Sequence, residues 1–527
     1  MNQSTDSQDA VFAFLADPAT HGGRAVRRID THAAAVFLAG DRALKVKRAV
    51  KFPFLDYSTL ARRRAACTAE LEANRPFAPE LYLGVVPIAR TADGRLQLGG
   101  SGEPVEWAVE MRRFDENRTL DRLADAGHID DALADRLARA VAAMHVCALA
   151  ADHAAWVGAL QQIADQNAAA FAEFPALFAA EAAARTDRAT RATLDRLRPL
   201  LLERGRRGLV RRGHGDLHLA NIALIDGRPV PFDAIEFDPL IASGDVLYDL
   251  AFLLMDLVER GLKAPANTVL NRYLTETGKS EDLDGLAALP LFMSLRASIR
   301  AKVGAAQMRH ADADRRRELG DSAKVYFRLA LRLIEPPPPV LVAVGGLSGT
   351  GKSTLSRALA PHLDPAPGAV IARSDVERKA LFGVGETEGL PERAYRADAT
   401  TKVYARVADK AARVLDAGHS AVADAVYARA DERAAIAAVA AAKQVRFRGL
   451  FLVADLDRRL QRVGARSADA SDADAAVARR QEDLPLDDVD WIRVDASGSI
   501  EDTLERACAA VGCGPPAARG GDRQSAS

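Results

Sequence analysis

Hydrophobic residues show two different spacings in the first part of the chain, and the change from one spacing to the other predicts two lobes. Short apolar runs separated by turn residues indicate strands at residues 34–38, 43–46, 81–88 and 105–111. Apolar residues at helical spacing indicate helices at residues 60–74, 129–148, 154–172, 181–202 and 246–260. Ser58 is the expected cap of the first of these helices. The pattern therefore predicts a small β-rich lobe before a large helical lobe.

Four consecutive prolines, Pro336–Pro339, mark the clearest boundary, because proline neither continues a helix nor joins a central strand. After them, strands are expected at residues 340–344, 370–372, 421–426 and 447–453, with helices between them. This alternation is typical of an α/β domain with a parallel sheet. The predicted divisions are an N-terminal segment (1–24), a first domain (25–335, with lobes 25–112 and 113–335), a linker (336–339), a second domain (340–511) and a disordered tail (512–527).

The composition fits a globular protein and excludes several classes. At 527 residues the chain is too long for a single core, and 49% of its residues are hydrophobic and 27% charged. Its net charge of −1 argues against a protein that coats nucleic acid, and the basic cluster at residues 204–212 is expected to be a solvated face. The four cysteines lack metal-ligand spacing. Because we find no signal sequence and no apolar run of about 18 residues, we expect a cytoplasmic protein without membrane or nucleic-acid partners.

The segment His214–Asn221 (HGDLHLAN) contains the first candidate site. Asp216 precedes Asn221 by five residues, which is the spacing of a kinase catalytic loop. Phosphoryl transfer to a hydroxyl needs a carboxylate for that hydroxyl and oxygen ligands for magnesium. The turn Asp226-Gly227 predicts a hairpin that brings Asp233 beside Asn221, where both can hold magnesium. This order of residues predicts a phosphotransfer site with Asp216 as its catalytic residue.

Nearby polar residues are given other roles. Asp245 and Asp249 precede or begin a helix, so we expect them to brace the loop or to cap that helix. His218 either binds substrate or has a structural role. A lone aspartate or asparagine in a loop is usually a turn former, and only the combined spacing favours the functional interpretation.

The second candidate site is a P-loop, in the pattern Gly-x4-Gly-Lys-Ser between a strand and a helix. Its glycines let backbone N–H groups converge on phosphates, its lysine reaches the β and γ phosphates, and its serine hydroxyl contacts magnesium. The residues expected to bind ATP here are Gly346, Leu347, Ser348, Gly349, Thr350, Gly351, Lys352, Ser353 and Thr354, with Ser353 also a magnesium ligand. The sequence therefore predicts a second ATP site.

Residues beyond the P-loop favour a kinase over a motor or switch. Asp375 follows a strand, at the edge of the sheet where ligands bind, and is expected to accept the proton of a substrate hydroxyl. Arg373 and Arg378 are expected to hold an anionic substrate, and Asp424 to hold magnesium through water. Four later arginines lie on a predicted helical hairpin that can close as a lid, although each also fits a solvated helix face. They are Arg462, Arg466, Arg479 and Arg480, of which Arg466 and Arg480 are our lid candidates.

The segments His214–Asn221, Phe232-Asp233 and Asp245–Ala251 resemble the aminoglycoside phosphotransferase family, relatives of protein kinases that phosphorylate small molecules. The resemblance covers about residues 25–330 and implies a bilobal, protein-kinase-like α+β fold. It also implies that Asp216 is the catalytic base and that Asn221 and Asp233 bind magnesium.

The same resemblance implies a strand lysine that contacts the ATP phosphates and a helix glutamate that pairs with it. Lys45 or Lys47 fits the first role, and Glu70 or Glu72 fits the second, with Lys45 and Glu70 preferred. Met111 lies where the interlobe hinge would meet adenine. Two departures from the protein-kinase pattern are a missing Gly-x-Gly-x-x-Gly loop and a glycine, Gly215, in place of a regulatory arginine, so small-molecule phosphorylation is the stronger expectation.

Residues 339–510, with the P-loop, Asp375 and the arginine hairpin, resemble small P-loop kinases of the gluconate-kinase and zeta-toxin type. Fusions of the two kinds of domain are a recognisable bacterial arrangement. We therefore expect a bifunctional protein that transfers the γ-phosphate of magnesium-bound ATP to hydroxyl groups of small molecules at two sites. One alternative is a single active kinase domain regulated by an ATP-binding or ATP-hydrolysing P-loop domain. The other is a toxin-like nucleotide-sugar kinase.

Overall fold

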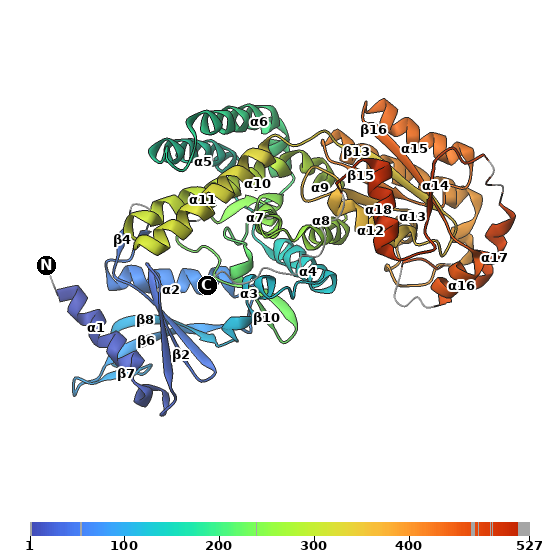
Figure 1. The fold of residues 1–527 in the computed structure, drawn as a ribbon. Helices are drawn as coiled ribbons and strands as arrows, with labels where there is room; N and C mark the ends of the chain where they lie inside the picture. Colours follow the sequence, from blue (N-terminus) through green and yellow to red (C-terminus); the bar gives the residue numbers. More distant parts are fainter. Residues whose placement is uncertain are drawn as a thin grey trace. The chain divides into compact units, whose positions relative to one another are not determined.

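The computed structural model describes residues 3–52, 55–238, 240–464, 470–472, 474–484, 486 and 488–514, with side chains from residue 8 onward. Figure 1 shows the helices and strands of the chain. Contacts between residues group the chain into two compact units. The first unit consists of residues 1–165 and 198–256, and the second of residues 166–197 and 257–527. Each unit thus draws on two separate stretches of the chain.

An antiparallel sheet forms the small lobe of the first unit and confirms the predicted β-rich lobe. Its strand order is β1-β2-β3-β8-β6-β7. The strands are β1 (Val26–Asp30), β2 (Ala34–Ala39), β3 (Arg42–Lys47), β6 (Tyr82–Arg90), β7 (Leu96–Leu98) and β8 (Glu103–Arg112). A small pair, β4 (Lys51–Phe52) and β5 (Leu55–Asp56), precedes helix α2 (Leu60–Asn74). The cap of α2 is Thr59 rather than the predicted Ser58, because the Thr59 hydroxyl accepts the Arg62 N–H at 3.3 Å.

Helix α1 (Gln3–Ala16) packs against this sheet. Val11, Phe12 and Leu15 are buried in one hydrophobic cluster with residues of β2, β3 and β8. The Gln8 side chain accepts the N–H of Ala49 at 2.8 Å and donates to Glu106 at 2.9 Å. The segment predicted to precede the first domain therefore contributes to the core of the small lobe.

Helices and short hairpins follow the small lobe, as the change of spacing predicts, and complete a kinase-like arrangement. They are α3 (Leu120–Asp125), α4 (Asp131–Cys147), α5 (His153–Glu173), α6 (Ala180–Arg206), β9 (Val210–Arg212), β10 (Ile222–Ile225), β11 (Arg228–Pro231), β12 (Ser243–Asp245) and α7 (Val246–Glu259). One prediction here is wrong: Arg204, expected on a solvated face, is buried. Its guanidinium donates to both carboxylate oxygens of Asp245, at 2.6 and 2.8 Å, and this pairing makes its burial possible.

The second unit includes further helices before the proline run: α8 (Lys263–Thr277), α9 (Ser280–Gly285), α10 (Leu289–Gln307) and α11 (Ala313–Ile334). Helices α10 and α11 pack along each other. Of the helices in the described part of the chain, none is long and apolar enough to cross a membrane.

A five-stranded parallel sheet, in the order β14-β15-β13-β16-β17, confirms the predicted α/β domain. Its strands are β13 (Val340–Gly346), β14 (Val370–Arg373), β15 (Ala421–Asp424), β16 (Arg446–Val453) and β17 (Ile492–Asp495). The helices are α12 (Lys352–Leu359), α13 (Ser374–Phe382), α14 (Ala397–Asp416), α15 (Ala430–Ala442), α16 (Leu456–Gly464), α17 (Ala475–Arg480) and α18 (Ile500–Val511).

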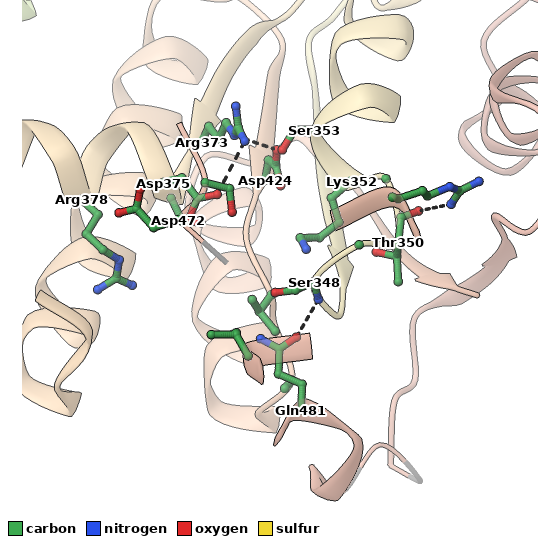
Figure 2. Close-up of a pocket in the computed structure, with 18 of the residues that line it drawn as sticks. Ser348, Thr350, Lys352, Ser353, Arg373, Asp375, Arg378, Asp424, Asp472 and Gln481 are labelled. Atoms are coloured by element: carbon green, nitrogen blue, oxygen red, sulfur yellow. Dashed lines mark hydrogen bonds and ion pairs between the residues drawn. The ribbon is translucent and has the colours of Figure 1, made fainter. Parts of the chain in front are cut away.

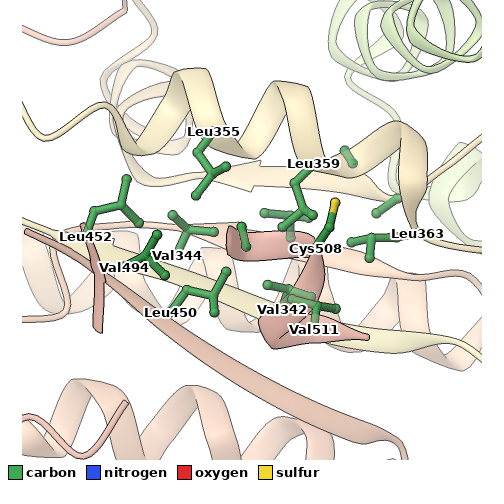
Figure 3. Packing of buried hydrophobic residues seen from close by; sticks show 14 of the residues in the cluster. Val342, Val344, Leu355, Leu359, Leu363, Leu450, Leu452, Val494, Cys508 and Val511 are labelled. Atoms are coloured by element: carbon green, nitrogen blue, oxygen red, sulfur yellow. The ribbon is translucent and has the colours of Figure 1, made fainter. Parts of the chain in front are cut away.

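The central strand β13 is buried along its whole length, so both of its faces are covered. On one face, Val342 and Val344 meet Leu355 and Leu359 of α12 and Val511 of α18 (Figure 3). Helices α14 and α15 contact β13 as well. Burial on both faces explains why this strand is a continuous apolar run in the sequence.

Helix α8 contacts the edge strand of the parallel sheet, within the second unit. The Asn271 side chain accepts the N–H of Ile371 at 2.8 Å and donates to the carbonyl of Ala369 at 3.1 Å. Asn267 donates to the same carbonyl at 3.0 Å. The compact units therefore do not divide at the proline run, and the predicted domain limits stay a prediction. Most of the predicted tail, from residue 515 onward, lies outside the described residues.

Candidate functional site

Two side chains from α7 hold the loop that contains Asp216. The carboxylate of Asp249 accepts the N–H of His214 at 2.9 Å and that of Gly215 at 3.0 Å, while Asp256 accepts the N–H of Leu219 at 2.9 Å. Asp249 is also 3.3 Å from the ring nitrogen of His145. The expectation that Asp249 braces the loop agrees with these contacts.

His214 is buried in the loop as a neutral imidazole. Its Nδ1 accepts the N–H of Asp216 at 3.3 Å, so the proton lies on Nε2, which donates to the carbonyl of Phe232 at 2.8 Å. Burial lowers the pKa of His214, although Asp249 and Asp216 oppose this shift. The histidine thus connects the loop to the segment that leads into Asp233.

Asp216 and Asn221 lie side by side. The Asn221 amide nitrogen donates to the backbone carbonyl and to the carboxylate of Asp216, both at 3.0 Å. Because the nitrogen is engaged, the amide oxygen of Asn221 is the atom that can face a metal ion. His218 lies 3.4 Å from the Asp216 carboxylate and packs edge-on against Phe252, and these contacts do not distinguish the two roles predicted for it.

The predicted hairpin forms, with Asp226 and Gly227 at positive φ between β10 and β11. The chain returns so that the N–H of Phe232 donates to the Asn221 carbonyl at 2.9 Å. Asp233 follows at φ 63°, a conformation that is rare for residues other than glycine. Its N–H donates to the hydroxyl of Tyr82 at 3.0 Å, which fixes this strained residue next to Asn221.

Both candidate lysines contact the same glutamate. Lys45 Nζ lies 2.8 Å from Glu70 Oε1, and Lys47 Nζ lies 2.6 Å from Glu70 Oε2. Lys45 also pairs with Asp233, and Lys47 pairs with Glu236. Glu70 is fully buried, whereas the alternative partner Glu72 is exposed. The geometry favours Glu70, and it places Lys45 beside the candidate magnesium ligand.

Charge pairing keeps these groups ionised despite burial. Burial opposes the charge of Lys45, but Asp233 and Glu70 outweigh it and raise the lysine pKa well above its ordinary value. Asp233 is only partly enclosed; its partial desolvation disfavours the ionised form, but the positive charge of Lys45 lowers its pKa overall. At neutral pH the site therefore contains an anionic Asp233 beside a cationic Lys45.

Met111 lies near the end of β8, paired with Ala43 of β3 on one side and Tyr82 of β6 on the other. The chain leaves the sheet at Arg112 and enters the helical lobe, as expected for an interlobe hinge. Between β1 and β2, the residues Thr31, His32 and Ala33 take the place of a glycine-rich loop.

The P-loop connects β13 to α12 and has the backbone of a phosphate cradle (Figure 2). Gly346, Gly349 and Gly351 all have positive φ, and a Cβ on Gly349 would lie 2.5 Å from the Arg459 carbonyl. The carbonyl of Leu347 accepts the Thr350 hydroxyl at 2.8 Å and the Lys352 ammonium at 3.2 Å. Only glycine fits these positions, as phosphate binding by backbone N–H groups requires.

Asp424, Arg373 and Asp375 gather at the carboxyl ends of β15 and β14 (Figure 2). Arg373 lies 3.8 Å from Asp424 and 3.6 Å from Asp375. Burial raises the pKa of Asp424, while Arg373, Lys352 and a hydrogen bond from the Ser353 hydroxyl oppose the rise. These groups and the P-loop form one continuous site.

A cavity of about 1100 Å³ joins the P-loop to Asp375. Ser348–Thr354 and Asp424 line one part of it, and several arginines are among the residues that line the rest. These arginines are Arg373, Arg378, Arg396, Arg429, Arg462 and Arg480. A cavity of this size has room for a second molecule beside a nucleotide.

The predicted substrate and lid arginines differ in their surroundings. Arg378 is buried, donates to the Ala394 carbonyl at 2.5 Å and lies over the Tyr395 ring at 5.1 Å, so part of its guanidinium supports the cavity wall. Arg480 lines the cavity from α17. Arg462 binds the Thr350 carbonyl at 3.3 Å. Arg466 lies outside the described residues.

Sequence reasoning missed several side chains that shape the two sites. Gln481 Oε1 accepts the Ser348 N–H at 2.6 Å, and Arg459 donates to the Ser348 carbonyl at 2.9 Å. Asp472 binds Lys379 at 2.8 Å and the Tyr395 hydroxyl at 2.6 Å. Glu236 is the corresponding omission at the first site. None of these residues belongs to a motif with fixed spacing, so the sequence alone gave no signal for them.

The donor sets fit magnesium-bound nucleotide. Asn221 with Asp233, and Ser353 with Asp424, are oxygen ligands of the kind magnesium prefers, and magnesium commonly completes its shell with phosphates and water. Asp424 Oδ2 is buried and accepts no hydrogen bond, which leaves it available to a hydrated ion. Among the described residues, no cluster of three or more His, Cys, Asp or Glu side chains can hold a metal without such help.

Two family matches agree with the two folds. Residues 27–289 match the phosphotransferase enzyme family, and residues 341–484 match a family described as an AAA domain. The chain is therefore a fusion of a domain of the phosphotransferase enzyme family with a C-terminal P-loop domain.

Similar proteins include uncharacterised proteins of Mycobacterium tuberculosis and Mycobacterium bovis, each 29% identical over 489 residues, which is 91% of this chain and 94% of the relative. Among solved structures, an aminoglycoside phosphotransferase from Alicyclobacillus acidocaldarius is 13% identical, with a TM-score of 0.36, over 58% of this chain and 90% of its own. A gluconokinase from Sinorhizobium meliloti is 18% identical, with a TM-score of 0.25, over 33% and 92%. At these scores the two structures do not bear on substrate.

Proposed function

We propose that the protein is a bifunctional, ATP-dependent phosphotransferase that acts on hydroxyl groups of small molecules at two separate sites. Magnesium-bound ATP would supply the phosphoryl group at each. In both reactions the substrate hydroxyl oxygen bonds to the γ-phosphorus, the bond from that phosphorus to the bridging oxygen breaks, and ADP and the hydroxyl proton are released.

At the first site, Asp216 would orient the hydroxyl and take its proton. Asn221 and Asp233 would hold magnesium, and Lys45 would contact the phosphates while Glu70 keeps it in position. The support is the geometry: Asp216 touches Asn221, and Asp233 touches Lys45, which touches Glu70. Positioning and charge neutralisation are the main requirements of phosphoryl transfer.

At the second site, Lys352 and the P-loop amides would bind the phosphates, with Ser353 and Asp424 at the magnesium ion. Asp375 would take the proton of the acceptor hydroxyl, and Arg373 would neutralise charge beside it. The observation that carries this proposal is the cavity of about 1100 Å³ that continues from the P-loop to Asp375 and its arginines. A nucleotide switch needs no such space for an acceptor.

A screen of a metabolite library for ATP-dependent phosphorylation tests the proposal, using the full chain, Asp216→Asn and Lys352→Ala. We expect two groups of products, one lost in each variant by about 100-fold or more and retained in the other. Glu505→Ala, which changes an exposed residue of α18 that does not line the cavity, serves as a folded control. If neither variant loses any activity of the parent, the two-site assignment is wrong.

One arrangement supports the regulatory alternative. Asn267 and Asn271 lie in the stretch matched to the phosphotransferase family and form hydrogen bonds with the backbone at β14. This strand leads to Arg373 and Asp375. If the P-loop domain only regulates the first site, Lys352→Ala will alter the products that depend on Asp216 and remove none of its own. The same screen therefore separates the two functions.

A further inference from the structure

The first site contains two more ion pairs than the proposed reaction uses. Lys47 binds the far oxygen of Glu70 at 2.6 Å and pairs with Glu236 on its other side. Glu236 in turn accepts the hydroxyl of Tyr57 at 2.7 Å, and Lys47 lies 5.4 Å from the centre of the Tyr57 ring. Lys47 and Glu236 thus connect β3, α2 and the segment after Asp233.

Burial separates the roles of the two lysines. The Lys47 side chain is 4% exposed and enclosed by Glu70, Glu236 and Tyr57, whereas Lys45 is 14% exposed and faces Asp233, which is 46% exposed. When nucleotide binds in the proposed way, the Lys45 ammonium also contacts phosphate oxygens and the Asp233 carboxylate also binds magnesium. These new partners compete with the Lys45–Asp233 ion pair. The Lys45–Asp233 contact then weakens, and the Asp233 segment depends more on its remaining contacts with the small lobe, among them the Lys47–Glu236 pair.

We infer that Lys47 and Glu236 are positioning residues, which keep Glu70 and the Asp233 segment in place while Lys45 and Asp233 engage magnesium-bound nucleotide. This inference rests on the proposed function of the first site. The pair touches neither nucleotide nor acceptor and acts through the residues that do.

Charge balance gives the inference a distinctive consequence. The two lysines and the three carboxylates of Glu70, Asp233 and Glu236 carry a net charge of −1. Removing the Lys47 cation leaves the buried Glu236 with the Tyr57 hydroxyl but without its cationic partner, and Lys45 is then drawn away from the nucleotide toward the carboxylates. Removing the Glu236 charge as well restores the balance and releases Lys45.

The test measures binding of a non-hydrolysable ATP analogue with magnesium, by titration calorimetry, in full-length protein that carries Lys352→Ala. This background removes the P-loop site, so that the first site alone reports. We expect Lys47→Met to raise the Kd of the analogue by about 10-fold or more. We expect the double variant Lys47→Met with Glu236→Gln to recover most of the lost affinity. Lys51→Met, which removes an exposed lysine four residues away, should leave the Kd unchanged.

The outcomes separate the inference from the function beneath it. A double variant that binds as weakly as Lys47→Met, or more weakly, shows that the pair only fills space, and overturns the inference. An unchanged Kd in Lys47→Met overturns it too. Lys45→Met and Asp233→Asn are the reference variants: if they bind the analogue as well as their background does, the first site does not bind nucleotide as proposed.

Discussion

Asp249 supports the loop that contains Asp216. Its carboxylate accepts hydrogen bonds from two consecutive backbone N–H groups, those of His214 and Gly215. Both residues are buried, so water cannot replace the carboxylate as the acceptor. Asp249→Ala leaves both donors unsatisfied, so we expect the free energy of unfolding to fall by about 2–5 kcal/mol. Chemical denaturation of the full chain measures this loss.

The same change should reduce products that depend on Asp216 by about 100-fold, because the loop loses the geometry that catalysis requires. Binding of nucleotide by the P-loop should not change. Asp93→Ala, which removes an exposed aspartate from the first unit, is the matched control and should behave as the parent. Equal activity in Asp249→Ala and the control would refute the bracing role.

His419 makes the stability of the P-loop domain sensitive to acid. It is fully buried, its Nε2 lies 2.8 Å from the Gly368 carbonyl, and burial lowers its pKa from 6.5 to about 4. Between these values the unfolded chain binds the proton and the folded chain does not. Stability from this group is therefore complete above about pH 6.5 and falls as the pH drops toward 4, by about 2 kcal/mol between pH 7 and pH 5.

His419→Gln keeps a donor for the Gly368 carbonyl but does not titrate. Denaturation at pH 5 and pH 7 should show that the parent loses about 2 kcal/mol more than this variant over the interval. An identical pH dependence in the two proteins would mean that folding does not shift the pKa of His419.

At the residue scale, the sequence indicated those roles that have a fixed spacing. Asp216, Asn221 and Asp233 follow from the loop and the Asp-Gly turn, and the P-loop follows from its glycines. The choice between Lys45 and Lys47 could not be made in this way, because residues two apart on a strand face the same side. Only the tertiary contacts with Asp233 and Glu236 distinguish them.

At the scale of elements, the contact of α8 with β14 is the most consequential. The Asn271 amide satisfies the N–H of Ile371 and the carbonyl of Ala369 as a neighbouring strand would. Asn271→Ala removes both hydrogen bonds, and we expect it to lower the free energy of unfolding by about 1–3 kcal/mol. Hydrogen exchange of the Ile371 amide should accelerate, because this N–H loses its acceptor.

Glu276→Ala on the same helix is the control for Asn271→Ala, since Glu276 is an exposed residue five positions further along α8. Exchange at Ile371 should be unchanged in this variant. If Asn271→Ala also leaves the exchange rate unchanged, the side chain does not support the edge of the sheet.

The predicted elements were most reliable where one face of the element is buried. The hairpin of β2 and β3 and helix α2 follow the pattern closely. Helix α10 gave no clear stripe because residues 291–298 are buried in succession, so polar and apolar faces do not alternate. Strand β17 is an edge strand of four residues, three of which are exposed, and its pattern is too short and too polar to recognise.

At the scale of the whole molecule, the two candidate nucleotide sites predict two bound nucleotides per chain. Calorimetric titration with a non-hydrolysable ATP analogue and magnesium should give a stoichiometry of two for the parent. It should give one for Lys352→Ala and none for Lys352→Ala with Asp233→Asn. Each site has its own cation and its own oxygen ligands, so loss of one should not abolish the other.

A stoichiometry of one in the parent would contradict this prediction, and the single variants would identify the site that remains. Lys51→Met, an exposed substitution, should bind two nucleotides like the parent.

The sequence predicted both folds because each site has its own motif. It did not predict which helices support the parallel sheet, because the contacts of Asn267 and Asn271 are specific to the tertiary structure.

Those contacts determine where the protein can be divided in the laboratory. A fragment that starts at the proline run would lack α8. The Ile371 N–H and the Ala369 carbonyl, at the edge strand β14, would then lose their side-chain partners and become exposed. Exposed strand edges recruit other strands, so such a fragment is prone to aggregate even though its P-loop motif is complete. A soluble version of the P-loop domain should therefore begin upstream of Lys263 and carry α8 with it.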